Sequence, residues 1–364
     1  MQLRGPSAVA ALACFIAGLW GGLVRIGVPL PLPLVGAVPN HGILMVSGFL
    51  GSVISLERAV AIERPWAYAA PLLTALGGAA LVIGGPYRIG ATMILIGSIV
   101  FVASSVVIIW RRNNAATWMM ALAALAWVLG NLRWLSGAPV PAIVFLWASF
   151  IVVTVSAERV ELSRILSPSR GSVAVLIGAC AVSIAAAAWG SRGWSARSVG
   201  ASWIAIAIWL ARFDIARHNY SRPGLPRFMA VAIALGTVWL AMAGGTVVIR
   251  GEVAGSLWYD AILHSLFLGF AFSMIFAHAP VIIPSIAGVP LAFSRAFYVP
   301  LVALSASLAG RIVSDALVAA TTREVFGAAN ALALLSFFVV VGWAIRRGIA
   351  NAAHATEDSS LAVR

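Results

Sequence analysis

The chain is made of long apolar runs separated by short breaks that hold most of its charges, prolines and glycines. The runs are about 18 to 22 residues long, the length that a helix needs to cross about 30 Å of hydrocarbon. About twelve runs start near residues 8, 39, 66, 89, 115, 139, 172, 197, 228, 256, 297 and 326. The pattern predicts an all-α polytopic integral membrane protein with about 12 transmembrane helices.

The breaks between the runs are too short to hold a soluble domain. Among the longest are VPLPLPLVGAVP at 28–39 and RHNYSRPGLPR at 217–227. We therefore expect a single transmembrane helical domain over residues 1–350 and a polar cytoplasmic tail over residues 351–364. The first apolar run follows a single Arg, as in a signal peptide. It continues to about Gly27 without a clear cleavage site, so it is interpreted as the first span.

Composition and charge agree with this interpretation. Hydrophobic residues make up 62% and charged residues 10% of the 364 residues, and the mean hydropathy is +1.01. A soluble domain of this composition could not cover its surface with polar groups. The net charge of +13 comes from arginines scattered through short loops, so no nucleic-acid partner is expected. The two cysteines, Cys14 and Cys180, lie in apolar runs, and neither a disulfide nor a cysteine metal motif is expected.

The distribution of arginine predicts the orientation. If the N-terminus is cytoplasmic, 16 of the 24 arginines fall on the cytoplasmic side and 8 on the other. Cytoplasmic loops are enriched in positive residues, so both termini are predicted to be cytoplasmic.

The second run ends in SLERAVAIER and the sixth in SAERVELSR, both on the predicted cytoplasmic side. These segments are interpreted as charge-paired stops at the interface, with a distant internal repeat as the alternative.

Five histidines carry the candidate chemistry. His218 and His354 lie in polar segments, where solvated side chains are expected, and no role is assigned to them. His41, His264 and His278 lie in or near the second and tenth runs, where an ionisable side chain usually has a functional partner.

His41 and His264 are expected at similar depth. Each lies 16 residues before the expected inner end of its run, at Glu57 and Pro280 respectively. At about 1.5 Å of rise per residue, both rings would lie near the outer face. Two neutral imidazoles at one depth can bind a haem iron between them if their helices are neighbours, which the sequence leaves open. The alternative is a helix-capping or interhelical hydrogen bond. Asp260, one turn before His264, is placed to accept its ring proton and fix the tautomer.

Two methionines share a helix face with a histidine. Met45 follows His41 by four residues, and Met274 precedes His278 by four. A thioether beside an imidazole suits copper(I) or an axial haem position, and methionine is also a common filler of apolar cores.

His278 is expected to belong to a different site. It follows His264 by 14 residues, about 21 Å along a helix, so one iron cannot bind both. Pro280 and Pro284 in the segment FAHAPVIIPSIAGVP predict a kinked or broken helix there. His278 then either satisfies freed carbonyl groups or serves as a second metal or haem ligand.

Three segments resemble haem–copper oxidase subunit I. HGILMVSGFLG is similar to its second span, where a His-Gly-x-x-Met pattern supplies a low-spin haem ligand, and WYDAILHSLFLGF stands in span ten, which carries the opposite ligand. IFAHAPVIIPSIAG resembles the Gly-His-Pro-Glu-Val-Tyr stretch with a copper ligand. Here the Glu and Tyr are replaced and the stretch follows span ten rather than lying in span six, so the copper role carries over to His278 only in part.

Over most of its length the chain is similar to the NnrS-like family, twelve-span proteins distantly related to these oxidases. The resemblance is carried by GLWGGLVRIG, the His41 helix, ERVELSR and the segment from His264 to His278. It implies a bacterial inner membrane, haem b, copper as a second candidate cofactor, and a link to the nitric oxide response. Arg25 and Arg133, expected on the outer side, would pair with haem propionates or act as interfacial anchors.

The histidine count limits the chemistry that the resemblance implies. Oxidases and nitric oxide reductases of the superfamily use six histidines for two haems and a copper, and this chain has five. We therefore expect binding or sensing of a gas such as nitric oxide, or electron relay, rather than a full dinuclear reductase. One alternative is a transporter of a small solute or metal ion, for which Arg311 and Asp315 would suit a gated path. Another is a cofactor-free assembly partner of a respiratory complex.

Overall fold

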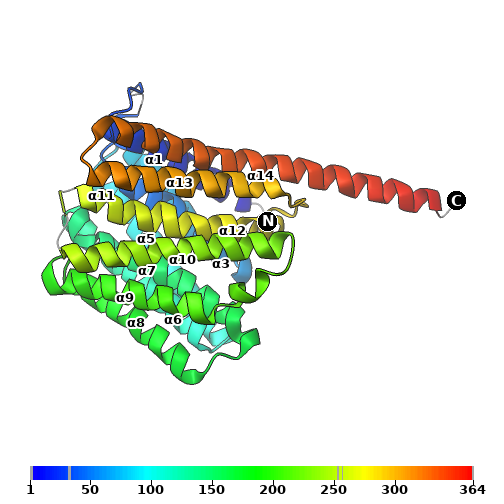
Figure 1. Cartoon of the computed structure of the whole chain (residues 1–364), viewed down its shortest axis with the longest axis horizontal. Helices are drawn as coiled ribbons and strands as arrows, with labels where there is room; N and C mark the ends of the chain where they lie inside the picture. The colour runs from blue at the N-terminus through cyan, green and yellow to red at the C-terminus, as the bar shows by residue number, and fades with distance from the viewer. Residues whose placement is uncertain (1–2, 32–33, 252–253, 256, 363–364) are drawn as a thin grey trace.

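The computed structural model describes residues 3–31, 34–251, 254–255 and 257–362 (Figure 1). Within these ranges the regular structure is helical, and twelve segments are long and apolar enough to cross a membrane. The twelve segments are called spans one to twelve in chain order. In chain order the helices are α1 (Arg4–Arg25), η1 (Val35–Ala37), α2 (His41–Ile43), η2 (Leu44–Gly51), α3 (Ser52–Ile62), η3 (Pro65–Tyr68), α4 (Ala69–Val82), α5 (Tyr87–Arg111), α6 (Ala115–Leu135), α7 (Val140–Ser163), η4 (Arg164–Leu166), α8 (Arg170–Trp189), α9 (Gly193–Phe213), η5 (Ile215–Asn219), α10 (Leu225–Arg250), α11 (Leu257–His264), η6 (Ser265–Ala271), α12 (Phe272–Ala287), η7 (Arg295–Phe297), α13 (Tyr298–Ala316) and α14 (Ala320–Ala362).

Each predicted apolar run corresponds to one span, and the predicted starts lie close to the observed ones. The largest difference is at span twelve, which begins at Ala320 rather than near residue 326. The breaks hold residues that stop a helix or start the next one. Before α6, for example, the Asn114 side chain accepts a hydrogen bond from the Thr117 amide, and the Thr117 hydroxyl accepts one from the Asn114 amide.

The sequence-based expectation that span ten ends at Pro280 is wrong, and of the two predicted alternatives, a kinked or a broken helix, the broken helix is excluded. α12 continues through Pro280 and Pro284 to Ala287. Proline inside an apolar helix is tolerated when neighbouring helices and local adjustments satisfy the freed backbone groups. Span ten is therefore longer at this end than the sequence predicted.

The helices pack side by side with nearly parallel axes, and both termini lie toward the right-hand end in Figure 1. Span six, which contains α7, is buried over 83% of its most apolar window, more than any other span, so it lies at the centre. Large rings fill the space around it, including Trp127, Trp147 and Trp203. α14 projects beyond the other helices at its C-terminal end. The predicted tail over 351–364 continues this helix as far as Ala362, and residues 363–364 lie outside the described residues.

Spans two and ten each contain a π-helix. η2 follows His41–Ile43 in span two, and η6 follows directly after His264 in span ten. A π-helix is wider than an α-helix and is frequently found at functional sites. The histidine in each span therefore stands one turn or less before the same kind of irregularity.

Candidate functional site

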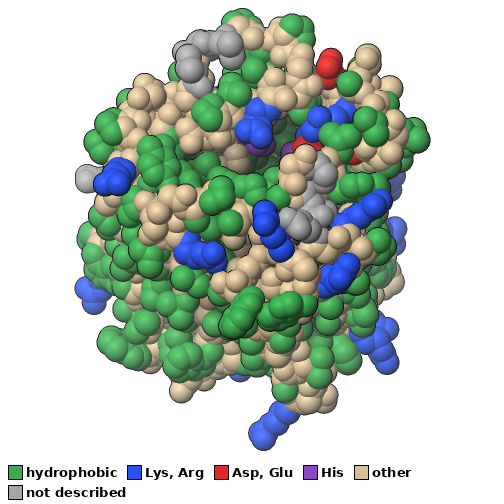
Figure 2. All heavy atoms as spheres, turned by 90° about the vertical axis from the view of Figure 1, so that its left-hand side faces the viewer, with side chains coloured by type: hydrophobic (Ala, Val, Ile, Leu, Met, Phe, Trp, Pro, Cys, Tyr) green, Lys and Arg blue, Asp and Glu red, His purple; other side chains and the backbone are tan. Residues whose placement is uncertain are grey.

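A cavity of about 430 Å³ lies at one end of the bundle. Its walls come from α1, span two, α7, span ten, α13 and α14. Figure 2 shows this end of the molecule, with a hollow in which histidine side chains are visible and arginine side chains around the opening. The end that holds the cavity is called the cavity end, and the other is called the opposite end.

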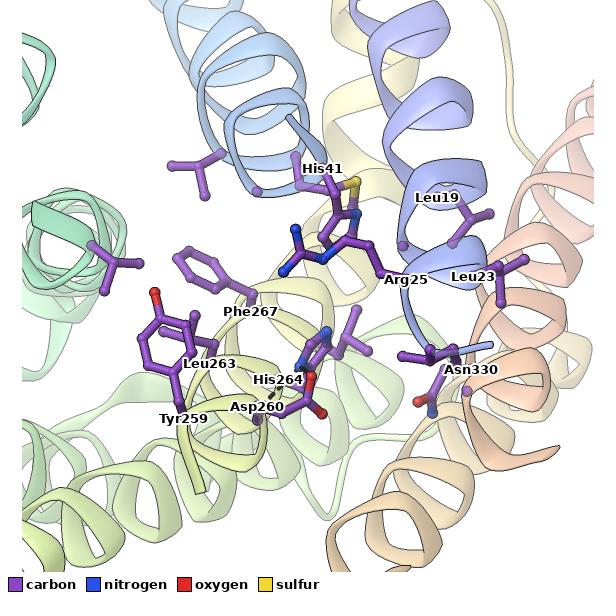
Figure 3. Close-up of a pocket in the computed structure, with 18 of the residues that line it drawn as sticks. Leu19, Leu23, Arg25, His41, Tyr259, Asp260, Leu263, His264, Phe267 and Asn330 are labelled. Carbon is purple, nitrogen blue, oxygen red and sulfur yellow. Dashed lines mark hydrogen bonds and ion pairs between the residues drawn. The ribbon is translucent and has the colours of Figure 1, made fainter. Parts of the chain in front are cut away.

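His41 and His264 face each other across the cavity (Figure 3). Their ring centroids are 6.5 Å apart, and the ring planes are inclined by only 14°. Farther along the same two spans, the rings of Phe49 and Phe272 lie 5.9 Å apart. Spans two and ten are therefore neighbours, which the sequence had left open.

Both histidines present the same ring nitrogen to the cavity. His41 Nδ1 lies 2.5 Å from the Gly18 carbonyl oxygen, and His264 Nδ1 lies 2.8 Å from the Asp260 carbonyl oxygen. Because a carbonyl oxygen only accepts, Nδ1 carries the proton in each ring and Nε2 keeps its lone pair. Neither Nε2 has a hydrogen-bond partner among the described residues. Each Nε2 is therefore available to bind a metal ion.

Asp260 connects His264 to two arginines. One carboxylate oxygen lies 3.2 Å from His264 Nδ1, the contact expected from the spacing of four residues. Arg311 donates to the same carboxylate through Nε and Nη2, each at 2.9 Å, and Arg323 lies 3.3 Å from it. Arg323 also pairs with Asp315 at 2.8 Å. A ring that donates to a carboxylate held in this way is fixed in tautomer and orientation.

Three other polar side chains on the cavity wall have at least one atom that is free to form a further hydrogen bond, as judged from the described residues. Arg25 pairs with no carboxylate there and donates only a long hydrogen bond, 3.5 Å, to the Val38 carbonyl. The buried Tyr259 hydroxyl and the buried Asn330 Oδ1 have no hydrogen-bond partner, while Asn330 Nδ2 donates to Ser307 at 2.7 Å. The Tyr259 hydroxyl and Asn330 Oδ1 would hydrogen-bond to the polar edge of a ligand, because a buried polar group without a partner is costly. The exposed Arg25 guanidinium would add a positive charge there.

Two glycines of α1 allow that helix to approach the site. A Cβ atom on Gly22 would lie 2.6 Å from Cε1 of His41, and one on Gly18 would lie 2.9 Å from the Met45 sulfur. Met45 itself lines the cavity on the His41 side. The segment GLWGGLVRIG therefore contains residues whose small size makes room for His41 and Met45.

Three of the predicted site residues lie away from the cavity. Arg133 donates to the Ala188 carbonyl at 3.0 Å and lines a separate pocket of about 340 Å³ with Trp189 and Arg192. Met274 is buried and does not line the cavity. The third is His278, whose surroundings are described next.

His278 belongs to a buried hydrogen-bond network at the opposite end. Its Nδ1 donates to the Met274 carbonyl at 2.7 Å, and its Nε2 accepts from Arg159 Nη1 at 3.0 Å. Arg159 also binds both carboxylate oxygens of Asp214 at 2.6 Å. Both ring nitrogens are engaged, so metal binding at His278 would require Arg159 to release the ring. The Met274 carbonyl is the ordinary helical partner of the His278 amide and is not one that either proline of α12 frees, so His278 belongs to the Arg159 network rather than playing the carbonyl-satisfying role that the sequence suggested.

Of the remaining residues singled out in the sequence, those that the structure describes lie away from the cavity. The cysteines are free and buried. His218 is exposed, and the His354 side chain lies outside the described residues. Arg58 at the end of span two pairs with Glu158 at the end of span six at 2.8 Å, which links the two charge-paired segments directly.

Four cavity residues were not identified from the sequence as part of a site with the histidines. The sequence suggested Arg311 only as part of a transport path, and it suggested no role for Arg323, Tyr259 or Asn330. Tyr259 lies inside the quoted segment WYDAILH, next to Asp260, and this was the one available signal. Arg311, Arg323 and Asn330 reach the cavity from α13 and α14, and no local spacing relates those helices to span ten.

In the part of the chain that the structure describes, fold and site together define an all-helical protein with twelve helices of membrane-spanning length and a cavity that holds two facing histidines. The chain belongs to the family described as "Domain of unknown function (DUF8744)", which matches residues 4–346. No curated protein matches the chain.

Proposed function

We propose that this chain is a multi-pass protein of a bacterial inner membrane that binds haem b between His41 and His264. Its role would be to bind or sense nitric oxide in the response to nitrosative stress. The observation that carries the proposal is the pair of nearly parallel imidazole rings, 6.5 Å apart, each with an unoccupied Nε2.

The residues of the cavity fit this group. Two metal–imidazole bonds of about 2 Å each, with one ring radius on either side, account for a separation close to the observed 6.5 Å. A volume of about 430 Å³ lies within the usual range of ligand pockets, and apolar side chains such as Leu19, Val144 and Phe267 form much of the wall. A flat apolar ligand with a polar edge matches these surroundings.

Each residue of the site has a distinct task in this proposal. His41 and His264 would bind the iron through Nε2, and Asp260 would hold the tautomer of His264. Arg25 and Tyr259 would receive the propionates, because a guanidinium forms strong charge-assisted hydrogen bonds with a carboxylate. When bound, haem supplies a redox-active iron that can take a diatomic gas. Copper is a second candidate cofactor, and Met45 is the cavity residue that suits copper(I).

The cavity end would face the periplasm. Arg25, Arg311 and Arg323 surround the cavity, and all three belong to the smaller set of arginines that the sequence puts on the outer side. A gas that enters from outside would then reach the site without crossing the bilayer.

The test is the absorption spectrum of detergent-purified protein, expressed with ample haem, in the oxidised and dithionite-reduced states. We expect a Soret band and sharp reduced α and β bands in the wild type, lost or shifted in His41→Ala and in His264→Ala. His218→Ala is the matched control, since that ring is exposed and far from any cavity residue in sequence, and it should leave the spectrum unchanged. A colourless wild-type protein, or bands that survive both cavity substitutions, would overturn the proposal.

Transport of a small solute or metal ion is the second candidate. It is favoured by the charged cluster of Asp260, Arg311, Asp315 and Arg323, which lies in apolar helices beside an open cavity. Substrate-dependent flux in proteoliposomes made from colourless protein would support this alternative. Flux that requires Asp260 would identify the cluster as part of the path.

A further inference from the structure

The two cavity histidines are held very differently. His264 lies inside span ten, and its Nδ1 contacts both a carbonyl of its own helix and the Asp260 carboxylate. That carboxylate is fixed in turn by Arg311 and Arg323 from spans eleven and twelve. The His264 ring is therefore fixed by contacts that involve spans ten, eleven and twelve.

His41 has a single anchor. It is the first residue of its helix, directly after the Asn40 cap position, and its Nδ1 contacts only the Gly18 carbonyl of α1. No carboxylate contacts this ring in the described part of the chain. Its neighbour Gly42 lines the cavity and has open space where a side chain would be, whereas the other side of the His41 ring lies against Gly22 of α1.

This asymmetry affects the strength of the two metal bonds. A carboxylate that accepts the Nδ1 proton makes the imidazole more basic and a stronger metal ligand, and loss of such a partner typically costs about 10- to 100-fold in metal affinity. A neutral carbonyl has a weaker effect. The bond to His41 is therefore the weaker of the two.

We propose that a diatomic gas displaces His41 and leaves His264 in place. This inference rests on the proposed haem function and identifies how the same site would respond to its ligand. His41 Nε2 would give up its place on the reduced haem iron as the gas takes it, so one bond to the iron would be lost and one formed. No electron is transferred, and the His41 ring keeps its Nδ1 proton.

The test uses carbon monoxide as the probe gas and resonance Raman spectroscopy as the readout. Photolysis of the reduced carbon monoxide complex leaves the iron bound to the retained histidine, and the frequency of the iron–histidine stretch reports which one it is. We expect the photolysed wild type to match the reduced double variant His41→Ala/Met45→Leu, in which His264 is the remaining ligand and Met45 cannot replace His41. A match to His264→Ala instead would overturn the proposal.

A second variant keeps the test decisive if His264→Ala fails to fold or to bind haem. Asp260→Asn removes the charge of the carboxylate that contacts the His264 ring, so it should lower the stretch frequency of the photolysed complex. Glu324→Gln is the matched control on the same end of the molecule, because Glu324 has no contact with either ring among the described residues. An unchanged frequency in Asp260→Asn would show that His41 is retained and overturn the proposal. Absence of any haem in the wild type would instead overturn the proposed function.

Carbon monoxide binding rates give an independent readout. In the wild type, His41 must leave first, so the rate should reach a plateau as the gas concentration rises. In His41→Ala, with Met45→Leu added to remove a replacement ligand, the rate should rise in proportion to the concentration and exceed the wild-type plateau at high gas concentration. Proportional binding at the same rate in both proteins would contradict displacement of His41.

Discussion

The three histidines of spans two and ten differ in how many of their ring nitrogens already form a hydrogen bond. The two histidines use Nδ1 for a backbone carbonyl and leave Nε2 unoccupied, whereas His278 has both nitrogens engaged. Two rings with the same proton position and one free nitrogen each form a pair suited to ligand binding. The third ring, with the same Nδ1 bond to its own helix, is part of a closed network because Arg159 lies within reach of its Nε2.

At the residue scale, the proposal predicts a difference between two arginines. Arg25→Gln should lower haem affinity by about tenfold, because it removes one charge-assisted hydrogen bond to a propionate. Arg133→Gln is the control, since Arg133 lines a different pocket and binds the Ala188 carbonyl. The measurement is the dissociation rate of haem to an excess of apomyoglobin in detergent. Equal rates in the two variants would remove Arg25 from the site.

The sequence predicted the histidine pair but not its surroundings. Glu57 and Pro280, from which the spacing was counted, both lie inside their helices, which continue to Ile62 and Ala287. The two reference points lie short of the true ends by similar numbers of residues, so His41 and His264 were still predicted at one depth. The spacing of four residues similarly predicted the contact between Asp260 and His264. The contacts of Arg311, Arg323 and Asn330 depend on how distant helices pack, and a single sequence does not contain that information.

At the scale of helices, apolar length predicted the number and position of the spans, and two features were missed. The π-helices in spans two and ten leave no mark on hydropathy, because one extra residue in a turn does not change which residues are apolar. The continuation of α12 beyond Pro280 was missed because proline was interpreted by its behaviour in water-exposed helices. Both misses concern how backbone hydrogen bonds are satisfied inside the bundle rather than which residues are apolar.

The network at the opposite end predicts a large effect on stability. Arg159, Asp214 and His278 come from span six, the end of span eight and span ten, and Arg159 and Asp214 are buried with side-chain exposures of 2% and 1%. Arg159→Ala would leave the Asp214 charge buried without its partner, which costs about 3 to 5 kcal/mol. We expect a markedly lower apparent Tm for this variant in detergent.

Arg164→Ala provides the comparison on the same end of span six. Its ion pair with Glu161 is at 3.2 Å, but the Arg164 side chain is 62% exposed. An exposed pair contributes at most about 1 kcal/mol, so the Tm should change little. Similar Tm values for the two variants would show that the buried network does not hold these spans together.

At the scale of the whole molecule, the arginine distribution predicts that the cavity end faces outward. Asn113 and Ser136 are both exposed and lie in loops at opposite ends of α6. In intact cells, a membrane-impermeant maleimide should label Ser136→Cys, whereas Asn113→Cys should react only after the inner membrane is opened. The native cysteines are buried and should give little background. Labelling of Asn113→Cys in intact cells would reverse the predicted orientation.

The two π-helices also set the angular phase between the ends of the molecule. Residues on one side of such a segment are rotated about the helix axis relative to those on the other side, by an amount that depends on the extra residue. If η2 were an ordinary α-helix with the same number of residues, His41 would be rotated by up to about 100° relative to Arg58, which pairs with Glu158 at the opposite end. The rings of His41 and His264 would then no longer face each other, although every side chain that contacts them would still be present. The alignment of the pair therefore depends on the backbone conformation of the two π-helices, whose own side chains, such as Met45 and Phe267, form part of the cavity wall.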